Sequence, residues 1–376
     1  MPIGLYIHIP FCASKCYYCD FLSFKRHEKQ EAYVDALIQE MEQTKKDLVS
    51  GTTIKSIFIG GGTPTVLPPL LLDKLLKAVV SCFNIEPDAE WTIEANPGTI
   101  DIEKLQVLRK YPITRISLGL QSTHDDLLRK IGRIHTFEDW EESIRLIKQH
   151  TSWEINTDLM FALPGQTEEA FLETLNTVTA YDIDHLSVYA LIIEEGTTFY
   201  KLYEEGKLEV ASDELDRRMY HTAQRYLNDK GYIQYEISNW SKPGKSCKHN
   251  AIYWQLEPYI GIGLGAHSLM NHARYYNETN MEAYLSAAGN LSLLRKEEEQ
   301  LTKEMAMQEY MFLGLRLLQG IDTLAFERRF GESVWQVYNE QLTKWIKYNV
   351  LVKDKERIYL SPYGLDVCNE VFASFL

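Results

Sequence analysis

The residues with the clearest chemical potential stand near the start of the chain. Cys12, Cys16 and Cys19 lie within a few positions of one another, whereas the other three of the six cysteines are scattered. Closely spaced thiolates suit soft metals, so the candidates are zinc, an iron–sulfur cluster, or a disulfide with one cysteine to spare. Inert thiols that cluster by chance are the plain alternative.

The spacing of these cysteines favours the iron–sulfur cluster. A structural zinc site usually takes four ligands in two separated pairs, and no second pair follows here. A two-cluster ferredoxin repeats its cysteine run, and this chain does not. A 4Fe–4S cluster bound by three cysteines fits better, because its fourth iron stays open to a small molecule.

Composition narrows the class of protein. The 39 basic and 53 acidic residues give a formal charge of -14, which argues against nucleic acid or anionic lipid as a general partner. No apolar run reaches the ~18 residues that span a bilayer, and the first residues lack the features of a signal peptide. We therefore expect a cytoplasmic protein without direct membrane insertion, whose cysteines stay as thiols or metal ligands.

The elements that must position the cysteines alternate along the first half of the chain. Short apolar runs alternate with helical patterns in six strand-then-helix steps, or nearly so. Strands are expected at residues 5–11, 56–60, 91–95, 115–120, 155–161 and 185–191, and helices over 28–49 and 70–82 and from 101, 123 and 167. This alternation predicts parallel strands with right-handed crossovers, in an open doubly wound sheet or a closed or partial barrel.

Ligands of such folds gather beyond the carboxyl ends of the strands. The residues at those ends should therefore face one cavity, namely Cys12, the run 60–63, Glu94, Gln121, Asp158 and Ile192. The glycines of 60–63 are expected to leave backbone N–H groups free for the amino-acid end of a ligand, although such a run alone is more often a tight turn. The two carboxylates have the alternative of capping the following helix.

The second half of the chain reads differently. A helix is expected over 213–230, strands over 232–237 and 259–266, and a charged linker over 295–299. Helices over 305–318, 322–330 and 334–348, followed by a hairpin over 350–360, suggest a small, mostly helical, winged-helix-like module, whose balanced charge gives DNA binding little support. We expect three regions, over 1–240, 241–298 and 299–376.

The cysteine motif resembles that of the radical S-adenosylmethionine (SAM) superfamily. The resemblance rests on Cys-x3-Cys-x2-Cys, the aromatic Tyr18 beside the last cysteine, and Gly60-Gly-Gly-Thr-Pro64 after the next strand. It implies a partial (β/α)6 barrel of the TIM type, with a 4Fe–4S cluster whose open iron is chelated by SAM. Four further runs, 6–11, 93–97, 117–121 and 158–167, look like the branch of oxygen-independent coproporphyrinogen III oxidases and haem chaperones (HemW).

The resemblance also implies roles for individual residues. Those that match the family's contacts to the cluster-bound SAM are Tyr6, Gly61, Glu94 and Ile192. Those that match the surroundings of a second SAM in the oxidase are Tyr18, Gly62, Thr63, Gln121, Arg133 and Asp158. Without the resemblance, the two tyrosines would be core aromatics and Arg133 an exposed or ion-paired side chain.

Three departures favour the chaperones over the oxidases. Phe21 stands where the oxidase pattern has a fourth cysteine, and Tyr6 leaves little room for the oxidases' N-terminal extension. The run 249–254, His-Asn-Ala-Ile-Tyr-Trp, matches the HNxxYW signature of the haem chaperones. Imidazole is a common axial ligand of haem, so His249 is the expected haem ligand, with Cys247 as the alternative donor. The aromatic pair offers flat faces for a macrocycle.

The expected function is a haem chaperone that binds haem, a 4Fe–4S cluster and SAM and delivers haem to acceptor haemoproteins. An enzyme is not the leading expectation. The alternative is an oxygen-independent coproporphyrinogen III oxidase, which the persistence of Gln121, Arg133 and Asp158 supports. A radical SAM enzyme with an unrelated substrate is the third hypothesis. A membrane-protein partner, and whether the chain is a monomer or a dimer, stay open.

Overall fold

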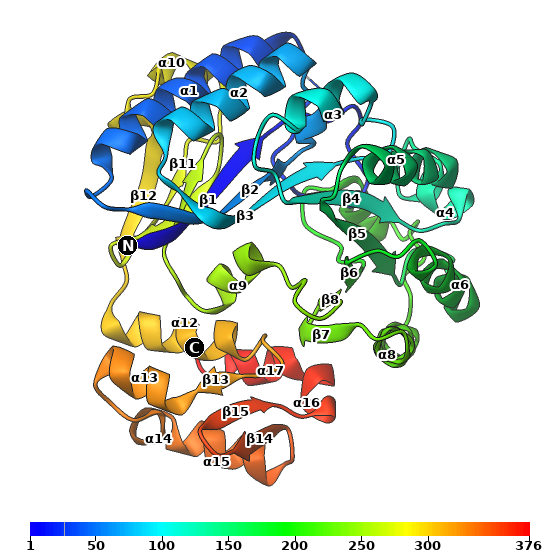
Figure 1. Cartoon of the computed structure of the whole chain (residues 1–376). Coiled ribbons are helices and arrows are strands. Elements are labelled where there is room, and N and C mark those ends of the chain that lie inside the picture. Colours follow the sequence, from blue (N-terminus) through cyan, green and yellow to red (C-terminus); the bar gives the residue numbers. More distant parts are fainter. Residues whose placement is uncertain (26) are drawn as a thin grey trace.

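Six parallel strands form the centre of the protein in a computed structural model that describes residues 1–25 and 27–376. They follow chain order across the sheet, each hydrogen-bonded to the next (Figure 1). Their bounds are β1 (Pro2–Ile9), β2 (Thr53–Gly61), β3 (Ile85–Ala95), β4 (Arg115–Gln121), β5 (Glu154–Phe161) and β6 (His185–Ala190). The predicted α/β fold of a partial radical SAM barrel is confirmed.

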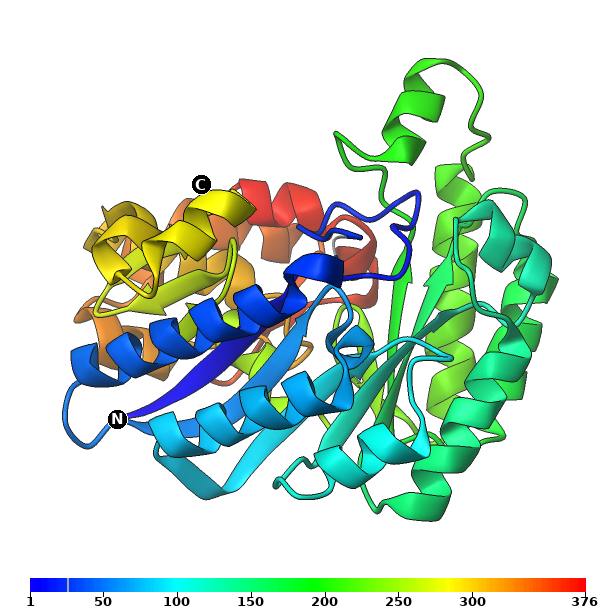
Figure 2. The same cartoon turned by 90° about the horizontal axis from the view of Figure 1, so that it is seen from above.

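Helices cover the outer face of these strands, as both cartoon views show (Figure 2). They are α1 (Gln30–Asp47), α2 (Pro69–Cys82), α3 (Ile102–Leu108), α4 (Asp125–Lys130), α5 (Phe137–His150), α6 (Glu168–Thr179) and α8 (Asp213–Asp229). The single helix expected from residue 123 is therefore two, α4 and α5. Alternating strand residues such as Ile57 and Ile59 belong to the same hydrophobic core as helix residues such as Leu37, and all three side chains are fully buried. This apolar layer between strands and helices stabilises the barrel.

Two extensions widen the sheet to twelve strands. Beside β1 lie β9 (Tyr259–Ile262), β10 (His267–Met270), β11 (Ala273–Asn277) and β12 (Arg295–Gln300), and beyond β6 lie β8 (Asn239–Ser241) and β7 (Ile233–Glu236). The linker expected over 295–299 is wrong, because this stretch is β12 and pairs with β11. Charged side chains suit an edge strand, since they remain in water while the backbone pairs on one side.

Short helices fill the connections between these strands. They are α7 (Thr198–Glu204), α9 (Lys248–Trp254), α10 (Met281–Ala287) and α11 (Leu291–Leu294). Helix α9 lies between the amino ends of the parallel strands and the C-terminal elements (Figure 1).

The C-terminal part is mostly helical, as predicted. It contains α12 (Lys303–Gly314), β13 (Ile321–Asp322), α13 (Thr323–Phe330), α14 (Val334–Val337), α15 (Asn339–Lys347), β14 (Leu351–Asp354), β15 (Arg357–Leu360), α16 (Pro362–Asp366) and α17 (Cys368–Ala373). The helix expected over 334–348 breaks at Tyr338. Division of the chain at residues 240 and 298 stays a prediction. Within the described residues, no helix is long and apolar enough to cross a membrane.

Candidate functional site

A cavity of about 520 Å³ runs through the barrel. Its walls include both Arg115 and Gln121, the first and last residues of β4, so it extends along the whole strand, ~20 Å at ~3.3 Å per residue. The sequence-predicted residues that line it are Cys12, Cys16, Tyr18, Cys19, Gly61, Gly62, Glu94, Gln121, Arg133, Asp158, Ile192 and Cys247. Tyr6, Thr63 and His249 are not among its lining residues.

The three cysteines lie on the loop that follows β1, at the carboxyl end of the barrel. This loop is held by backbone hydrogen bonds from Cys12 N to Phe24 O (3.1 Å) and from Tyr17 N to Ile131 O (3.0 Å). All three thiols are free and partly buried. Burial raises the pKa of Cys19 to about 11, so the thiolate needs a cation to form near neutral pH.

The donor set suits a cluster better than a single ion. Among the described residues, no three His, Cys, Asp or Glu side chains converge closely enough to hold one metal ion. In an iron–sulfur cluster each thiolate binds a different iron, so the thiolates stand further apart than the ligands of zinc. Three thiols on one cavity wall therefore fit the cluster.

The glycine run has a different role from the one expected. The N–H groups of Gly61, Gly62 and Thr63 are already bonded, to Glu94 Oε2 (3.0 Å), Ile9 O (2.9 Å) and Phe11 O (2.7 Å). The prediction of free N–H groups is thus wrong. A Cβ on Gly62 would lie 2.6 Å from Phe11 O, so glycine is required because the run packs against the backbone that leads into the cysteine loop.

Buried polar side chains surround the middle of the cavity. Burial, reinforced by the negative charge of Asp158, raises the pKa of Glu94 to about 8. Burial also raises the pKa of Asp158, whose carboxylate accepts a hydrogen bond from Asn156 Nδ2 (2.8 Å). Gln121 has a backbone φ of 74° and accepts from the Tyr189 hydroxyl at 3.3 Å. A buried carboxyl group with a raised pKa, such as that of Glu94, suits a ligand that brings hydroxyl or ammonium donors.

Arg133 connects this region to the cysteine loop. Its Nη1 donates to Asn96 Oδ1 (2.7 Å) and its Nη2 to the Tyr18 hydroxyl (2.9 Å). The guanidinium is therefore not an exposed surface group, and its Nε has no hydrogen-bond partner among the described residues. Asn96 also donates to Thr63 Oγ1 (2.7 Å), which places Thr63 behind the cavity wall.

Two predicted residues have a more ordinary setting. The Tyr6 hydroxyl is 2.9 Å from His8 Nδ1, beneath the cavity wall, and Ile192 is an exposed side chain at the cavity rim. Phe21, which replaces the oxidase cysteine, is 62% exposed at the same rim.

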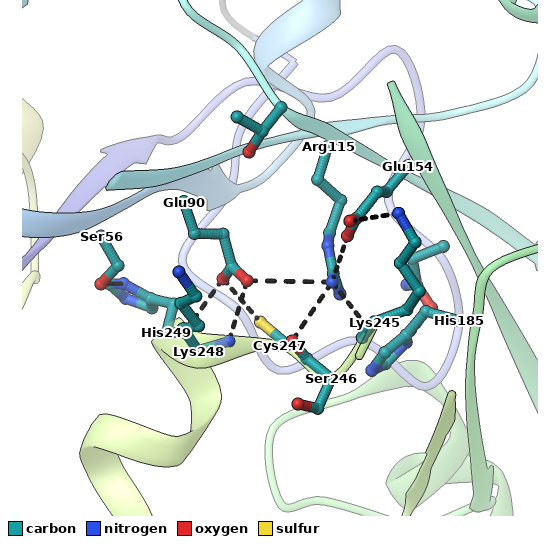
Figure 3. Close-up of polar contacts among 12 residues, drawn as sticks. Ser56, Glu90, Arg115, Glu154, His185, Lys245, Ser246, Cys247, Lys248 and His249 are labelled. Atoms are coloured by element: carbon teal, nitrogen blue, oxygen red, sulfur yellow. Dashed lines mark hydrogen bonds and ion pairs between the residues drawn. The ribbon is translucent and has the colours of Figure 1, made fainter. Parts of the chain in front are cut away.

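An ionic network that the sequence gave no reason to expect closes the amino end of the barrel (Figure 3). Arg115, 2% exposed, donates through Nη2 to Glu154 Oε2 and to Lys245 O, both at 2.7 Å, and lies 3.8 Å from Glu90. Glu154 is also paired with Lys245 (2.8 Å). These residues are tens of positions apart in the chain, so no local spacing could have revealed them.

Glu90 joins the network to the start of α9. Its carboxylate accepts from Cys247 Sγ (3.2 Å), Lys248 N (2.8 Å) and His249 N (3.0 Å). A carboxylate at this position stabilises the otherwise unpaired N–H groups of a helix start. The run 249–254 is thereby fixed against strands β3 and β4.

The residues of the HNxxYW run face different surroundings. His249, 1% exposed, has Nδ1 at 2.9 Å from Ser56 Oγ and Nε2 at 2.9 Å from the Tyr253 hydroxyl, and its ring stacks on Phe58. Burial lowers the pKa of His249 to about 3, which keeps the imidazole neutral. Neither ring nitrogen is free in this conformation. Asn250 lines the barrel cavity, and the Trp254 ring lies under the Arg316 guanidinium, 4.4 Å from the ring centre.

Comparison with known proteins decides the family. The radical SAM superfamily matches residues 6–178, and the HemN C-terminal domain matches residues 301–367. The chain is 37% identical to the heme chaperone HemW of Lactococcus lactis, over 100% of this chain and 97% of that protein. It is 36% identical to the heme chaperone HemW of Bacillus subtilis, over 99% of this chain and 98% of that protein. The chain belongs to the HemW family of radical SAM proteins.

The HemW family shares its fold with a solved enzyme. Coproporphyrinogen III oxidase (HemN) from Escherichia coli superposes with a TM-score of 0.86 and 22% identity, covering 100% of this chain and 90% of that chain. At this identity the likeness concerns the fold. Membership of the radical SAM superfamily implies a 4Fe–4S cluster and SAM, and the three free thiols on one cavity wall fit the cluster.

Proposed function

We propose that this protein is a haem chaperone, which binds haem, a 4Fe–4S cluster and SAM and hands haem to acceptor haemoproteins. The observation that carries the proposal is similarity to HemW proteins along the whole chain, together with the HNxxYW run beside the barrel cavity. Phe21 in place of a fourth cysteine supports it as well.

The carboxyl end of the barrel would hold the cofactors. We assign Cys12, Cys16 and Cys19 to the cluster, whose open iron supplies a binding point for SAM. The residues assigned to the cluster-bound SAM are Tyr6, Gly61, Glu94 and Ile192, and those assigned to a second SAM are Tyr18, Gly62, Thr63, Gln121, Arg133 and Asp158. Glu94 is well suited to a ribose hydroxyl, because within residues 1–25 and 27–376 its buried carboxyl accepts a single hydrogen bond, from Gly61 N.

The amino end would hold haem. The run 247–254 offers two donors for haem iron, His249 and Cys247. His249 can act as a ligand only if it gives up its hydrogen bond to Ser56 or Tyr253. The proposed acceptors are haemoproteins such as those of respiration, and some of these partners are membrane proteins. The proposed place of action is the cytoplasm.

Haem titration tests the proposal. Haem is added to the cluster-loaded protein and to His249→Ala, and the Soret band is followed. A saturable band in the wild type is expected, and the absence of binding in both proteins would refute the chaperone function.

Coproporphyrinogen III oxidase is the second candidate. It is supported by the shared fold and by the position of Gln121, Arg133 and Asp158 on the cavity wall. An anaerobic assay with reduced cluster, SAM and coproporphyrinogen III separates the two functions, since formation of protoporphyrinogen would favour the oxidase.

A further inference from the structure

Four successive hydrogen bonds cross the interior of the barrel, from the segment before α9 to Asp158. Cys247 N lies 3.3 Å from the Tyr235 hydroxyl, which lies 2.8 Å from His185 Nε2. His185 Nδ1 lies 2.7 Å from Asn156 Oδ1, and Asn156 Nδ2 lies 2.8 Å from Asp158 Oδ1. These four bonds, called the hydrogen-bond relay below, join the amino end of the barrel to a residue assigned to SAM.

The strands bring the members of the relay together. Asn156 and Asp158 stand two positions apart on β5, so their side chains point to the same side of the sheet. His185 is the register partner of Asn156 on the neighbouring strand β6. Asn156, Asp158 and His185 all line the barrel cavity, and Asn156 and His185 are buried.

The direction of the relay is fixed at the end near α9. A backbone N–H can only donate, so the Tyr235 oxygen accepts the hydrogen bond from Cys247 N. The Tyr235 O–H is then the donor to His185 Nε2, and this nitrogen carries no proton. Burial, reinforced by the charge of Arg115, lowers the pKa of His185, so the ring is neutral and its single proton is on Nδ1.

The other end of the relay requires the same direction. His185 Nδ1–H donates to Asn156 Oδ1, so the amide directs its Nδ2 toward Asp158. A flipped amide would bring Asn156 Oδ1 against the Asp158 carboxylate, and two acceptors at that distance repel each other. All four donors therefore point toward Asp158, an arrangement in which each hydrogen bond polarises the next.

His185 is the member that sets the orientation of the Asn156 amide. The other contact of Asn156 Oδ1 among the described residues is the Ser187 hydroxyl, at 3.4 Å, and Asn156 Nδ2 also contacts Ser117 Oγ at 2.8 Å. A hydroxyl can both donate and accept, so neither serine discriminates between the two orientations of the amide. The imidazole discriminates between them, because Tyr235 leaves it a proton on Nδ1 alone.

We propose that His185 and Tyr235 are positioning residues for a ligand at Asp158, and that they act on it through the Asn156 amide. This inference rests on the proposed assignment of Asp158 to a SAM molecule. The relay stabilises the Asp158 carboxylate and holds it in one orientation toward the cavity, where a ribose hydroxyl can donate to it. Loss of the relay frees the amide to turn, so the ligand loses an oriented acceptor.

SAM binding to the cluster-loaded full chain tests the proposal. Radiolabelled SAM is titrated, and the affinity followed is that of the SAM molecule whose binding Asp158→Asn weakens. Tyr235→Phe removes the phenolic O–H and should weaken this binding about threefold to tenfold, the effect of one hydrogen bond. Tyr232→Phe is the matched control and should leave the affinity unchanged, because its hydroxyl donates to Ile183 O, outside the relay.

Combination with Asp158→Asn separates positioning from a general loss of packing. If Tyr235 acts through Asp158, the double variant should bind SAM within about twofold of Asp158→Asn alone, since the two changes remove one interaction. Equal weakening by Tyr235→Phe in the presence and absence of the carboxylate would refute the positioning role. Unchanged affinity in Tyr235→Phe would also refute it, and would leave the assignment of SAM to Asp158 standing.

Substitutions of His185 show which ring nitrogen matters. The amide of Asn reaches the place of imidazole Nδ1, whereas the amide of Gln reaches the place of Nε2. His185→Asn should therefore bind SAM about threefold or more tightly than His185→Gln, because it retains the donor to Asn156. The reverse order would overturn the proposal.

A measurement without ligand stands apart from the variants and their folding. Heteronuclear NMR of the wild type with isotope-labelled histidine should show the Nδ1–H tautomer of neutral His185, and the Nε2–H tautomer would overturn the relay. If Asp158→Asn leaves SAM binding unchanged, the assignment of SAM to Asp158 fails and this inference fails with it. The haem titration reports on the chaperone function independently of both.

Discussion

The two ends of the barrel treat their polar groups in opposite ways. At the carboxyl end, Glu94 and Asp158 are buried, and the pKa of each is raised because burial outweighs the nearby positive charge of Arg133. At the amino end, Glu154 is paired with both Arg115 and Lys245, and its pKa is lowered. The carboxyl end thus has buried carboxyl groups that a ligand could hydrogen-bond, whereas most polar groups of the amino end form ion pairs and hydrogen bonds that position α9.

The polar groups of the two ends also come from different parts of the chain. The carboxyl-end groups lie on strands and on the loop between β1 and α1, close to where the chain turns. The amino-end network ties strands β3, β4 and β5 to a segment more than ninety residues further on. Both ends join residues that are far apart in the chain, but the carboxyl-end residues follow successive strands in chain order, whereas the amino-end network includes a segment that lies outside that order.

Removing a cysteine of the loop should have the largest effect. Cys16→Ala should abolish the cluster, because a 4Fe–4S cluster with only two protein ligands is not retained. Iron and acid-labile sulfide, measured on anaerobically purified protein, should fall to background, while Cys82→Ser keeps its iron. Full iron content in Cys16→Ala would remove that cysteine from the cluster site.

Breaking the amino-end network should cost stability rather than cofactor. Arg115→Met leaves Glu90 and Glu154 without their buried partner, so the free energy of unfolding should fall by about 3–5 kcal/mol. Urea unfolding of the cluster-free chain measures this. Lys245→Met is the matched control on the more exposed cation, with an expected loss of at most ~1 kcal/mol. If the free energy of unfolding fell equally in both variants, burial of the Arg115 guanidinium would not be the cause of its larger expected contribution to stability.

The carboxyl end should respond to rising pH. The pKa of Glu94 is about 8 in the folded protein against an ordinary 4.5, so the folded state holds a proton that the unfolded state has lost between these values. Stability should therefore fall as pH rises from about 5 to 8, by roughly 1–3 kcal/mol once relaxation is allowed for. Asp158, Arg133 and the Gly61 N–H face this carboxyl.

Glu94→Gln isolates this contribution, because it keeps the size of the side chain and removes the charge. Urea unfolding at pH 5 and pH 8 should show a smaller loss in the variant than in the wild type. An unchanged difference between the two pH values would show that Glu94 is not the group that titrates.

The amino end should respond in the opposite direction and more weakly. The pKa of Glu154 is depressed in the folded state, so its stabilisation is present above the ordinary pKa of 4.5 and is lost as pH falls below it. Glu154→Gln should therefore lower stability at neutral pH, flatten the acid limb of stability below pH 4.5 and leave the slope across the neutral range almost unchanged. Thermal melts from pH 3 to pH 6 compare the two proteins, and a steeper acid limb in the variant would contradict this sign.

The sequence alone predicted the strand–helix alternation, the cysteine loop and a part of the cavity wall. This was possible because the carboxyl ends of consecutive parallel strands meet at one edge, so position along the chain translates into position in space. Residues such as Glu94 and Gln121 could be placed in one cavity for that reason. The prediction failed for the free N–H groups of the glycine run, since the packing of two backbone segments cannot be read from glycine content.

Tertiary structure alone decided the amino end. Glu90, Arg115 and Cys247 come from three distant segments, and only the folded chain brings them together. The sequence predicted His249 as the haem ligand, because imidazole is a common axial ligand of haem iron and His249 lies in the HNxxYW run. Packing leaves neither donor free, since His249 shares hydrogen bonds with Ser56 and Tyr253 at its two ring nitrogens and the buried Cys247 thiol donates to Glu90.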